Sequence, residues 1–204
     1  ELSGGTIKVY NLIGSLEVSA ASGGAAVAEV TRQGGDAAKL KVEHGAGTLR
    51  VIYPGTQFVY PALGGNYEAS LRVRDDGTFN DDDDYDGGGR KVKVSSSGSG
   101  LAAWADVRLM LPAGARAELN IGVGKVTLTN VNGHIEVETA SGDVEGKATA
   151  GSLSIDTGSG DVTLAGHDGD LSVDTGSGNI VLGAVKSTGV SLDTGSGDVR
   201  VDGL

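Results

Sequence analysis

Three copies of the motif Asp-Thr-Gly-Ser lie near the C-terminus, in the stretches LSIDTGSGDV, LSVDTGSGNI and VSLDTGSGDV. Their aspartates are Asp156, Asp174 and Asp193. Aspartic proteases hold two carboxylates about 3 Å apart in turns of this kind, so that the pair shares one proton. The residue types therefore raise the hypothesis of acid–base catalysis by paired carboxylates.

The spacing of the motif favours a structural role instead. An apolar-x-apolar pattern recurs every nine residues, with one interval of ten. Its first positions are Val126, Ile135, Val144, Leu153, Val162, Leu171, Ile180, Val190 and Val199. Its second positions are Leu128, Val137, Gly146, Ile155, Leu164, Val173, Leu182, Leu192 and Val201. The copies of the motif recur at two such intervals, and a related ETASG run that begins at Glu138 precedes Asp156 by the same distance.

This periodicity predicts the fold class. Alternating apolar residues are typical of strands, and short strands bury their apolar side chains by stacking on equivalents about 4.8 Å away. The sequence therefore predicts an all-β chain, a single-stranded parallel β-helix or β-solenoid with about 18 residues and two strands per coil. We expect one domain over residues 1–204, regular over 113–204 and irregular over 1–112, where longer alternating runs leave antiparallel pairs or wider coils open.

On this fold the motif becomes the corner of a coil. Glu138, Asp156, Asp174 and Asp193 are expected to form one column along an edge, with each Asp accepting backbone hydrogen bonds and Gly supplying a positive φ. Calcium between coils is an alternative way to relieve their repulsion. We predict no catalytic residues and no enzyme. A polysaccharide-active β-helix enzyme, the competing class, needs paired carboxylates and a basic residue in a groove on one sheet face, and basic residues are few after Arg116.

A second candidate site is the acidic stretch RDDGTFNDDDDYDGGGR. Asp82, Asp84 and Asp86, followed by Gly87, match the opening of a calcium-binding loop, in which alternate carboxylates surround a hard cation. Lys93 stands where such a loop needs a bidentate Glu, so an EF-hand is excluded. The alternatives are a solvated acidic loop and a loop that docks on a basic partner.

Aromatic residues concentrate in a predicted insertion at about residues 54–104. Seven of the chain's eight aromatic residues lie in or beside it, namely Tyr53, Phe58, Tyr60, Tyr67, Phe79, Tyr85 and Trp104. One interpretation is a small local core that covers part of the solenoid. The other is a partner-binding surface in which exposed rings act as anchors. The exposure of the rings distinguishes the two.

Composition and charge limit the classes of binding partner that the chain can have. The net charge of −11 argues against nucleic acid, which requires clustered Lys and Arg, and favours basic proteins or divalent cations. The absence of Cys excludes disulfides and thiol catalysis. No apolar run approaches the ~18 residues that span a bilayer, so we expect no direct membrane insertion by this chain. Because the chain starts at Glu1 rather than Met, we expect a signal or anchor that has been removed or is missing.

Four stretches in fixed order, GGTIKVYNLIGSLEV, RVRDDGTF, ADVRLMLPAG and the DTGSGDV repeats, resemble a bacterial putative-adhesin family. The resemblance implies an extracytoplasmic β-solenoid, periplasmic or at the cell surface, without catalytic residues. We therefore predict a structural or interaction module of the cell envelope that docks onto a protein partner or a membrane-bound assembly. The alternative function is that of a calcium-dependent adhesin.

Overall fold

The computed structural model describes residues 1–64, 67–79, 88–187 and 189–203, and its strands form two sheets. The larger has 15 strands, and we call it the barrel-like sheet. Its strands are β1 (Ile7–Ile13), β2 (Leu16–Ala20), β3 (Val27–Gln33), β4 (Lys41–Gly45), β5 (Thr48–Ile52), β9 (Trp104–Leu111), β10 (Ala115–Val123), β11 (Val126–Thr129), β12 (Asn132–Ser141), β13 (Val144–Thr157), β14 (Val162–Asp168), β15 (Leu171–Thr175), β16 (Ile180–Lys186), β17 (Val190–Thr194) and β18 (Val199–Asp202). The smaller sheet contains β6 (Gln57–Val59), β7 (Glu68–Val73) and β8 (Arg90–Ser95). Two short 3-10 helices, η1 (Ala37–Lys39) and η2 (Pro61–Leu63), lie in connections.

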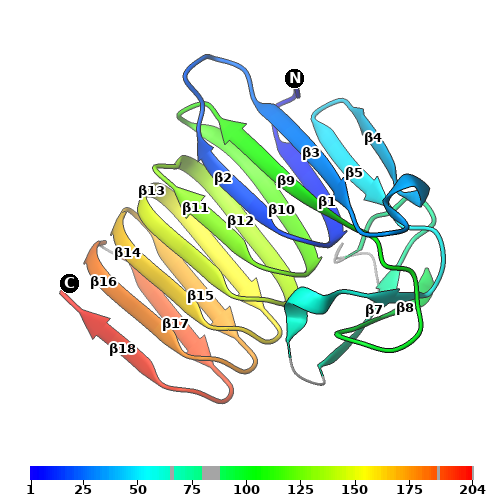
Figure 1. The fold of residues 1–204 in the computed structure, drawn as a ribbon. Helices are drawn as coiled ribbons and strands as arrows, with labels where there is room; N and C mark the ends of the chain where they lie inside the picture. The colour runs from blue at the N-terminus through cyan, green and yellow to red at the C-terminus, as the bar shows by residue number, and fades with distance from the viewer. Residues whose placement is uncertain (65–66, 80–87, 188, 204) are drawn as a thin grey trace.

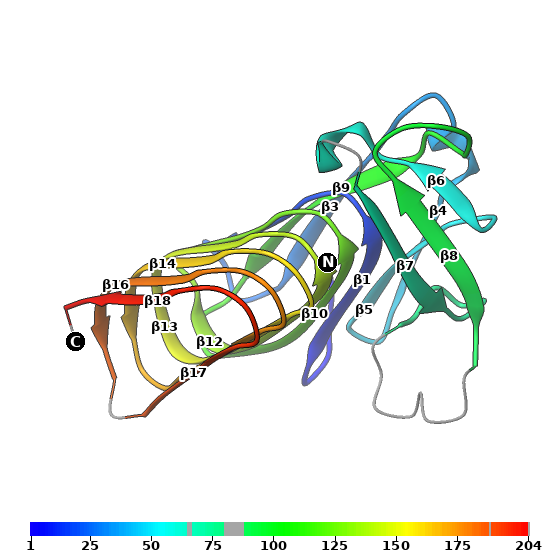
Figure 2. The same cartoon turned by 90° about the horizontal axis from the view of Figure 1, so that it is seen from below.

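The barrel-like sheet is nearly closed, with two faces that pack on each other (Figures 1 and 2). One face contains β4, β5, β1, β10, β12, residues 150–157 of β13, β15 and β17. The other contains β3, β9, β2, β11, residues 144–147 of β13, β14, β16 and β18. The long strand β13 joins the faces and has Ala148 at φ 51° between its two parts.

The parallel strands pair in the register that the repeat predicts. Val137 lies beside Ile155, and the row continues through Val173 to Leu192. Among the first positions of the nine-residue pattern, those from Val126 to Ile180 are at most 6% exposed. The expected column of Glu138, Asp156, Asp174 and Asp193 is confirmed by the same pairings.

The prediction of a single-stranded parallel β-solenoid is wrong, because the barrel-like sheet mixes parallel and antiparallel strands and does not stack them in chain order. Strand β1 pairs with β10, which places Ile7 beside Ala117. The chain between β1 and β10 forms strands that pair with the other edges of β1 and β2. Strand β5 pairs with β1, and β9 pairs with β2. Strands β3 and β4 then add antiparallel edges. The apolar pattern determines which face a side chain occupies, and it leaves the neighbour of each strand undetermined.

Two apolar cores hold the structure together. The first fills the barrel-like sheet with aliphatic side chains from both faces, such as Leu119, Leu128, Ile155 and Leu182. The second lies between the smaller sheet and the ends of β1, β5, β9 and β10, and contains Tyr10, Tyr53, Phe58, Tyr60 and Phe79. Figure 2 shows the smaller sheet beside β1 and β5, at the end of the molecule away from the C-terminus.

Candidate functional site

The candidate site is the outward side of β10, β12, residues 150–157 of β13, β15 and β17, which we call the acidic face. Its side chains form rows across the strands, because each strand pairs in parallel with the equivalent strand of the next repeat. One row contains Arg116, His134 and Ser152. Alternate residues point the other way, so Ile135 and Leu153 are buried beneath it.

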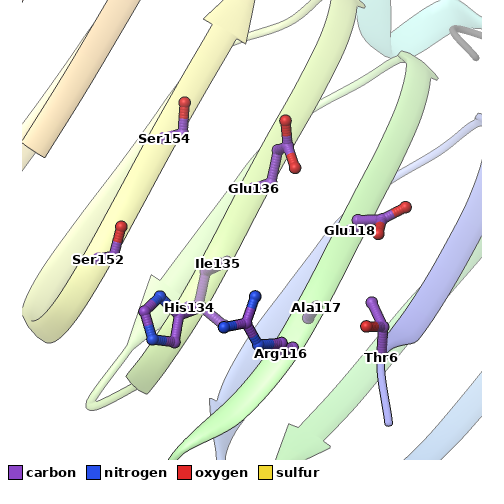
Figure 3. A pocket seen from close by; sticks show the side chains of 9 residues that line it. All are labelled: Thr6, Arg116, Ala117, Glu118, His134, Ile135, Glu136, Ser152 and Ser154. Atoms are coloured by element: carbon purple, nitrogen blue, oxygen red, sulfur yellow. The ribbon is translucent and has the colours of Figure 1, made fainter. Parts of the chain in front are cut away.

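The next row contains Glu118 and Glu136 on adjacent strands, followed by Ser154. Together with the first row and Thr6 it lines a hollow of about 250 Å³, shown in Figure 3. The Glu118 carboxylate forms an ion pair with Lys8 Nζ at 2.5 Å, and both side chains are over one-third exposed. The hollow therefore combines two carboxylates, a guanidinium and an imidazole on an open surface.

The third row of the acidic face is the carboxylate column. Asp156, Asp174 and Asp193 are exposed, and within the part of the chain that the structure describes their side chains form no hydrogen bond or ion pair. Partial desolvation and the negative charge of Asp174 raise the pKa of Asp156. Asp156, Asp174 and Asp193 therefore present unneutralised charge to solvent. Asp156 and Asp174 lie directly opposite each other on adjacent strands, and both remain exposed.

The threonines of the Asp-Thr-Gly-Ser copies donate side-chain hydrogen bonds to carbonyl groups of the preceding corner. Thr175 Oγ1 donates to the carbonyl of Gly160 at 3.2 Å, and Thr194 Oγ1 donates to that of Gly178 at 2.9 Å. Gly160 has φ 156°, and a Cβ there would lie 2.2 Å from the Gly142 oxygen. Each corner thus requires glycine because the preceding corner packs against it directly.

A second set of hydrogen bonds at these corners uses the Asp or Asn that follows the last glycine of each corner. The backbone N–H of Asp161 donates to Asp143 Oδ1 at 3.0 Å, and that of Asn179 donates to Asp161 Oδ1 at 2.7 Å. The N–H of Asp198 donates to Asn179 Oδ1 at 3.0 Å. The prediction that Asp156, Asp174 and Asp193 accept the backbone hydrogen bonds of the turns is therefore wrong. Asp143, Asp161 and Asn179 accept these backbone hydrogen bonds instead.

Four of the predicted partner-binding aromatics belong to the second core. Tyr53, Phe58 and Phe79 are at most 1% exposed, and Tyr60 is 8% exposed. The Tyr53 and Phe58 rings meet edge to face at 5.5 Å, and Tyr60 packs against Trp104. The Tyr53 hydroxyl lies 2.5 Å from the carbonyl oxygen of Ile13 and 2.8 Å from Asn11 Oδ1. Burial raises its pKa. These rings therefore form a small local core rather than a partner-binding surface.

The remaining aromatic positions differ among themselves. Trp104 is half-buried, and Tyr67 is 38% exposed with its hydroxyl 2.8 Å from Ser141 Oγ. Tyr85 lies outside the described residues. Tyr67 is therefore the one predicted anchor among the described positions that presents a large exposed ring.

The predicted calcium ligands Asp82, Asp84 and Asp86 also lie outside the described residues, so calcium binding there stays a prediction. Elsewhere in the described ranges, no group of three His, Cys, Asp or Glu side chains could hold a metal ion.

His167 is a buried histidine in β14. It is 2% exposed, and its Nδ1 lies 3.0 Å from Thr149 Oγ1. Its Nε2 lies 3.1 Å from the carbonyl oxygen of Asp170. Both ring nitrogens are satisfied, so the side chain has a structural role.

Sequence reasoning missed the hollow of Arg116, His134, Glu118 and Glu136. The signal was present, since His134 follows Arg116 by one full repeat of two nonapeptides, and Glu136 follows Glu118 by the same interval. Apolar residues and turns define the period of the repeat. Charged residues that recur at the same interval indicate that their side chains lie side by side on the outward surface.

No family model, curated protein or solved structure matches this chain. The resemblance to a putative-adhesin family and the extracytoplasmic location that it implies therefore stay predictions. Among the described residues no helix has the length and apolar character to cross a membrane.

Proposed function

We propose that this chain is a non-catalytic interaction module that binds a basic segment of a protein partner, free or within a membrane-bound assembly, on its acidic face. One observation carries the proposal: Asp156, Asp174 and Asp193 form an exposed, in-register column without a counter-charge in the described part of the chain. Lysine or arginine side chains of a partner would neutralise charges that now repel one another.

The two faces of the barrel-like sheet differ in charge pairing, which supports the choice of face. On the opposite face, Glu17 pairs with Arg108 at 3.0 Å, Glu145 with Lys125 at 2.6 Å and Asp202 with Arg200 at 2.8 Å. Those carboxylates already have partners. The net charge of −11 adds long-range attraction for a basic partner, which salt would screen.

Binding of a lysine-rich peptide tests this proposal. A fluorescent peptide of alternating lysine and serine should bind the protein, and the triple variant Asp156→Asn, Asp174→Asn, Asp193→Asn should weaken binding about tenfold. The matched control Glu17→Gln, Glu145→Gln, Asp202→Asn removes the same net charge from the opposite face and should keep most of the affinity. Equal losses in both variants would show only non-specific attraction and would refute the proposed face.

A second candidate function is hydrolysis or lyase cleavage of a polysaccharide. It is favoured by Glu118 and Glu136 lying side by side with Arg116 in the hollow. Against it, the hollow is open and Glu118 is already ion-paired with Lys8. Incubation with acidic and neutral polysaccharides decides the matter, since new reducing ends or unsaturated products that disappear in Glu136→Gln would establish the enzyme and contradict the non-catalytic proposal.

A further inference from the structure

Strands β17 and β18 end the barrel-like sheet with one side of each unpaired, and we call this the open end. Strand β17 pairs only with β15, and β18 only with β16, within the described residues. Val190 and Val199 are 37% and 46% exposed, whereas Leu171 and Ile180, their equivalents one layer inward, are 3% and 0% exposed. The exposure arises because no further strand of the described residues covers the apolar columns here.

The backbone at the open end has unused hydrogen-bonding groups. Leu171 N–H donates to Gly189 O, and Gly195 N–H donates to Thr175 O, so alternate residues of β17 bond to β15. The intervening residues, Val190, Leu192 and Thr194, therefore direct their N–H and C=O groups to the free edge. In β18, Asp198 O accepts a hydrogen bond from Ile180 N–H. The N–H and C=O groups of Val199 and Val201 therefore also point to the free edge.

We infer that the open end pairs with the open end of a second copy of this chain, through a two-fold axis perpendicular to the two faces. This axis turns each edge strand antiparallel to its counterpart, so that β17 meets β17 and β18 meets β18. Leu192 would oppose Leu192 and Val201 would oppose Val201 of the second copy. One axis serves both strands because the two residues are equally far from the middle of the turn at 195–198.

The outward side chains at the open end are complementary in this register. Arg200 would oppose Asp202 of the second copy, and Asp202 would oppose Arg200, so the existing pair at 2.8 Å gains two cross-strand partners. Ser191 would oppose Asp193, which keeps the two Asp193 carboxylates from facing each other directly. A register shifted by two residues would lose both features.

A second copy also suits the open end because a two-fold contact has closed symmetry. The same surface serves both partners, so the dimer leaves no open end for further growth. Stacking of the open end on the β3 and β4 edges of another copy would instead continue without limit. The charge of −11 on each copy opposes association, so the dimer should strengthen as salt screens that repulsion.

Sedimentation velocity over a range of protein concentrations, at low and high sodium chloride, tests the inference. We expect a monomer–dimer equilibrium that salt shifts toward the dimer. Arg200→Glu should weaken the dimer about tenfold, because Glu then opposes Asp202. Arg200→Glu combined with Asp202→Arg should restore it. Arg108→Glu, which breaks the corresponding pair on β2 and β9, is the matched control and should dimerise like the natural chain.

Circular dichroism and thermal unfolding of each variant establish that the monomer is folded. A natural chain that stays monomeric at every concentration and salt level would overturn the inference. A dimer that Arg200→Glu leaves unchanged, or an open-ended series of larger species, would overturn it as well. Because peptide binding uses the acidic face, a failed peptide experiment with intact dimerisation would refute the proposed function alone.

Discussion

At the end of the barrel-like sheet that carries β3 and β4, antiparallel strands and the smaller sheet surround the apolar interior, and Leu2 bridges to Ala26 over it. At the open end the last two described strands leave Val190 and Val199 exposed. The chain contains no aromatic residue after Trp104. The first region is held by large interlocking side chains and the second by repeated backbone contacts at glycine corners, so the two should respond differently to substitution.

Truncation of Phe58 should give the largest effect. Phe58 is fully buried in the second core, so Phe58→Ala should lower the free energy of unfolding by about 3–5 kcal/mol. The half-buried Leu192 at the open end provides the comparison, and Leu192→Ala should cost roughly 1 kcal/mol in the monomer. Urea unfolding at low protein concentration measures both. Similar losses would show that the two ends do not differ as described.

A methyl group at a glycine corner should have the next largest effect. Gly160→Ala places Cβ 2.2 Å from the Gly142 oxygen, and we expect a loss of about 2–4 kcal/mol in the free energy of unfolding. Gly24→Ala is the control, because a Cβ at Gly24 meets nothing within 4 Å. Thermal and urea unfolding should therefore separate the two alanine variants. A tolerated Gly160→Ala would mean that the corners do not limit the repeat.

Removal of the Tyr53 hydroxyl should have an intermediate effect. Tyr53→Phe removes the buried hydroxyl that lies within hydrogen-bonding distance of Asn11 Oδ1 and the Ile13 carbonyl, at a cost of about 1–3 kcal/mol. Tyr67→Phe, which removes a less buried hydroxyl, is the control and should cost less. Urea unfolding at neutral pH is the measurement. A larger loss in the free energy of unfolding for Tyr67→Phe than for Tyr53→Phe would contradict this prediction.

The same tyrosine predicts a loss of stability at alkaline pH. Burial raises the pKa of Tyr53, so the folded chain keeps a proton that the unfolded chain releases above about pH 10. The unfolded state then binds fewer protons, and stability falls as the pH rises. Tyr53→Phe should make this fall shallower in urea unfolding measured from neutral to alkaline pH. An unchanged slope would contradict the burial of an undissociated hydroxyl.

Relief of charge repulsion in the acidic column should give the smallest effect. Partial desolvation and Asp174 raise the pKa of Asp156, so the folded state favours its protonated form, and this contribution to stability is lost as the pH rises through that pKa. Asp174→Asn should lower the pKa of Asp156 in an NMR titration. It should also stabilise the protein by roughly 0.2–1 kcal/mol at neutral pH.

Asp170→Asn is the matched control for this change. It removes one charge just before β15, where Gly189 lies beside the carboxylate, and it should leave the pKa of Asp156 nearly unchanged. An equal shift of that pKa in both variants would indicate a general charge effect rather than repulsion within the column.

The sequence predicted the local order of the repeat well and the arrangement of the first half poorly. The nine-residue pattern identified inward residues such as Val126 and Ile155, and the interval between motifs identified the register of the acidic column. The neighbours of β1 and β2 could not be predicted, because Ile7 pairs with Ala117 and every strand carries a similar apolar pattern. The burial of Tyr53 and Phe58 depends on the smaller sheet, whose position no local pattern encodes.

Amide hydrogen exchange of Leu192 at low and high protein concentration shows whether the open end pairs with a second copy of the chain. We expect fast exchange in the dilute monomer, because this N–H points to the free edge, and slow exchange once the second copy pairs with it. Val173, one layer inward and 1% exposed, should stay protected at both concentrations. Exchange of Leu192 that is independent of concentration, whether fast or slow, would mean that the open end does not pair with a second copy.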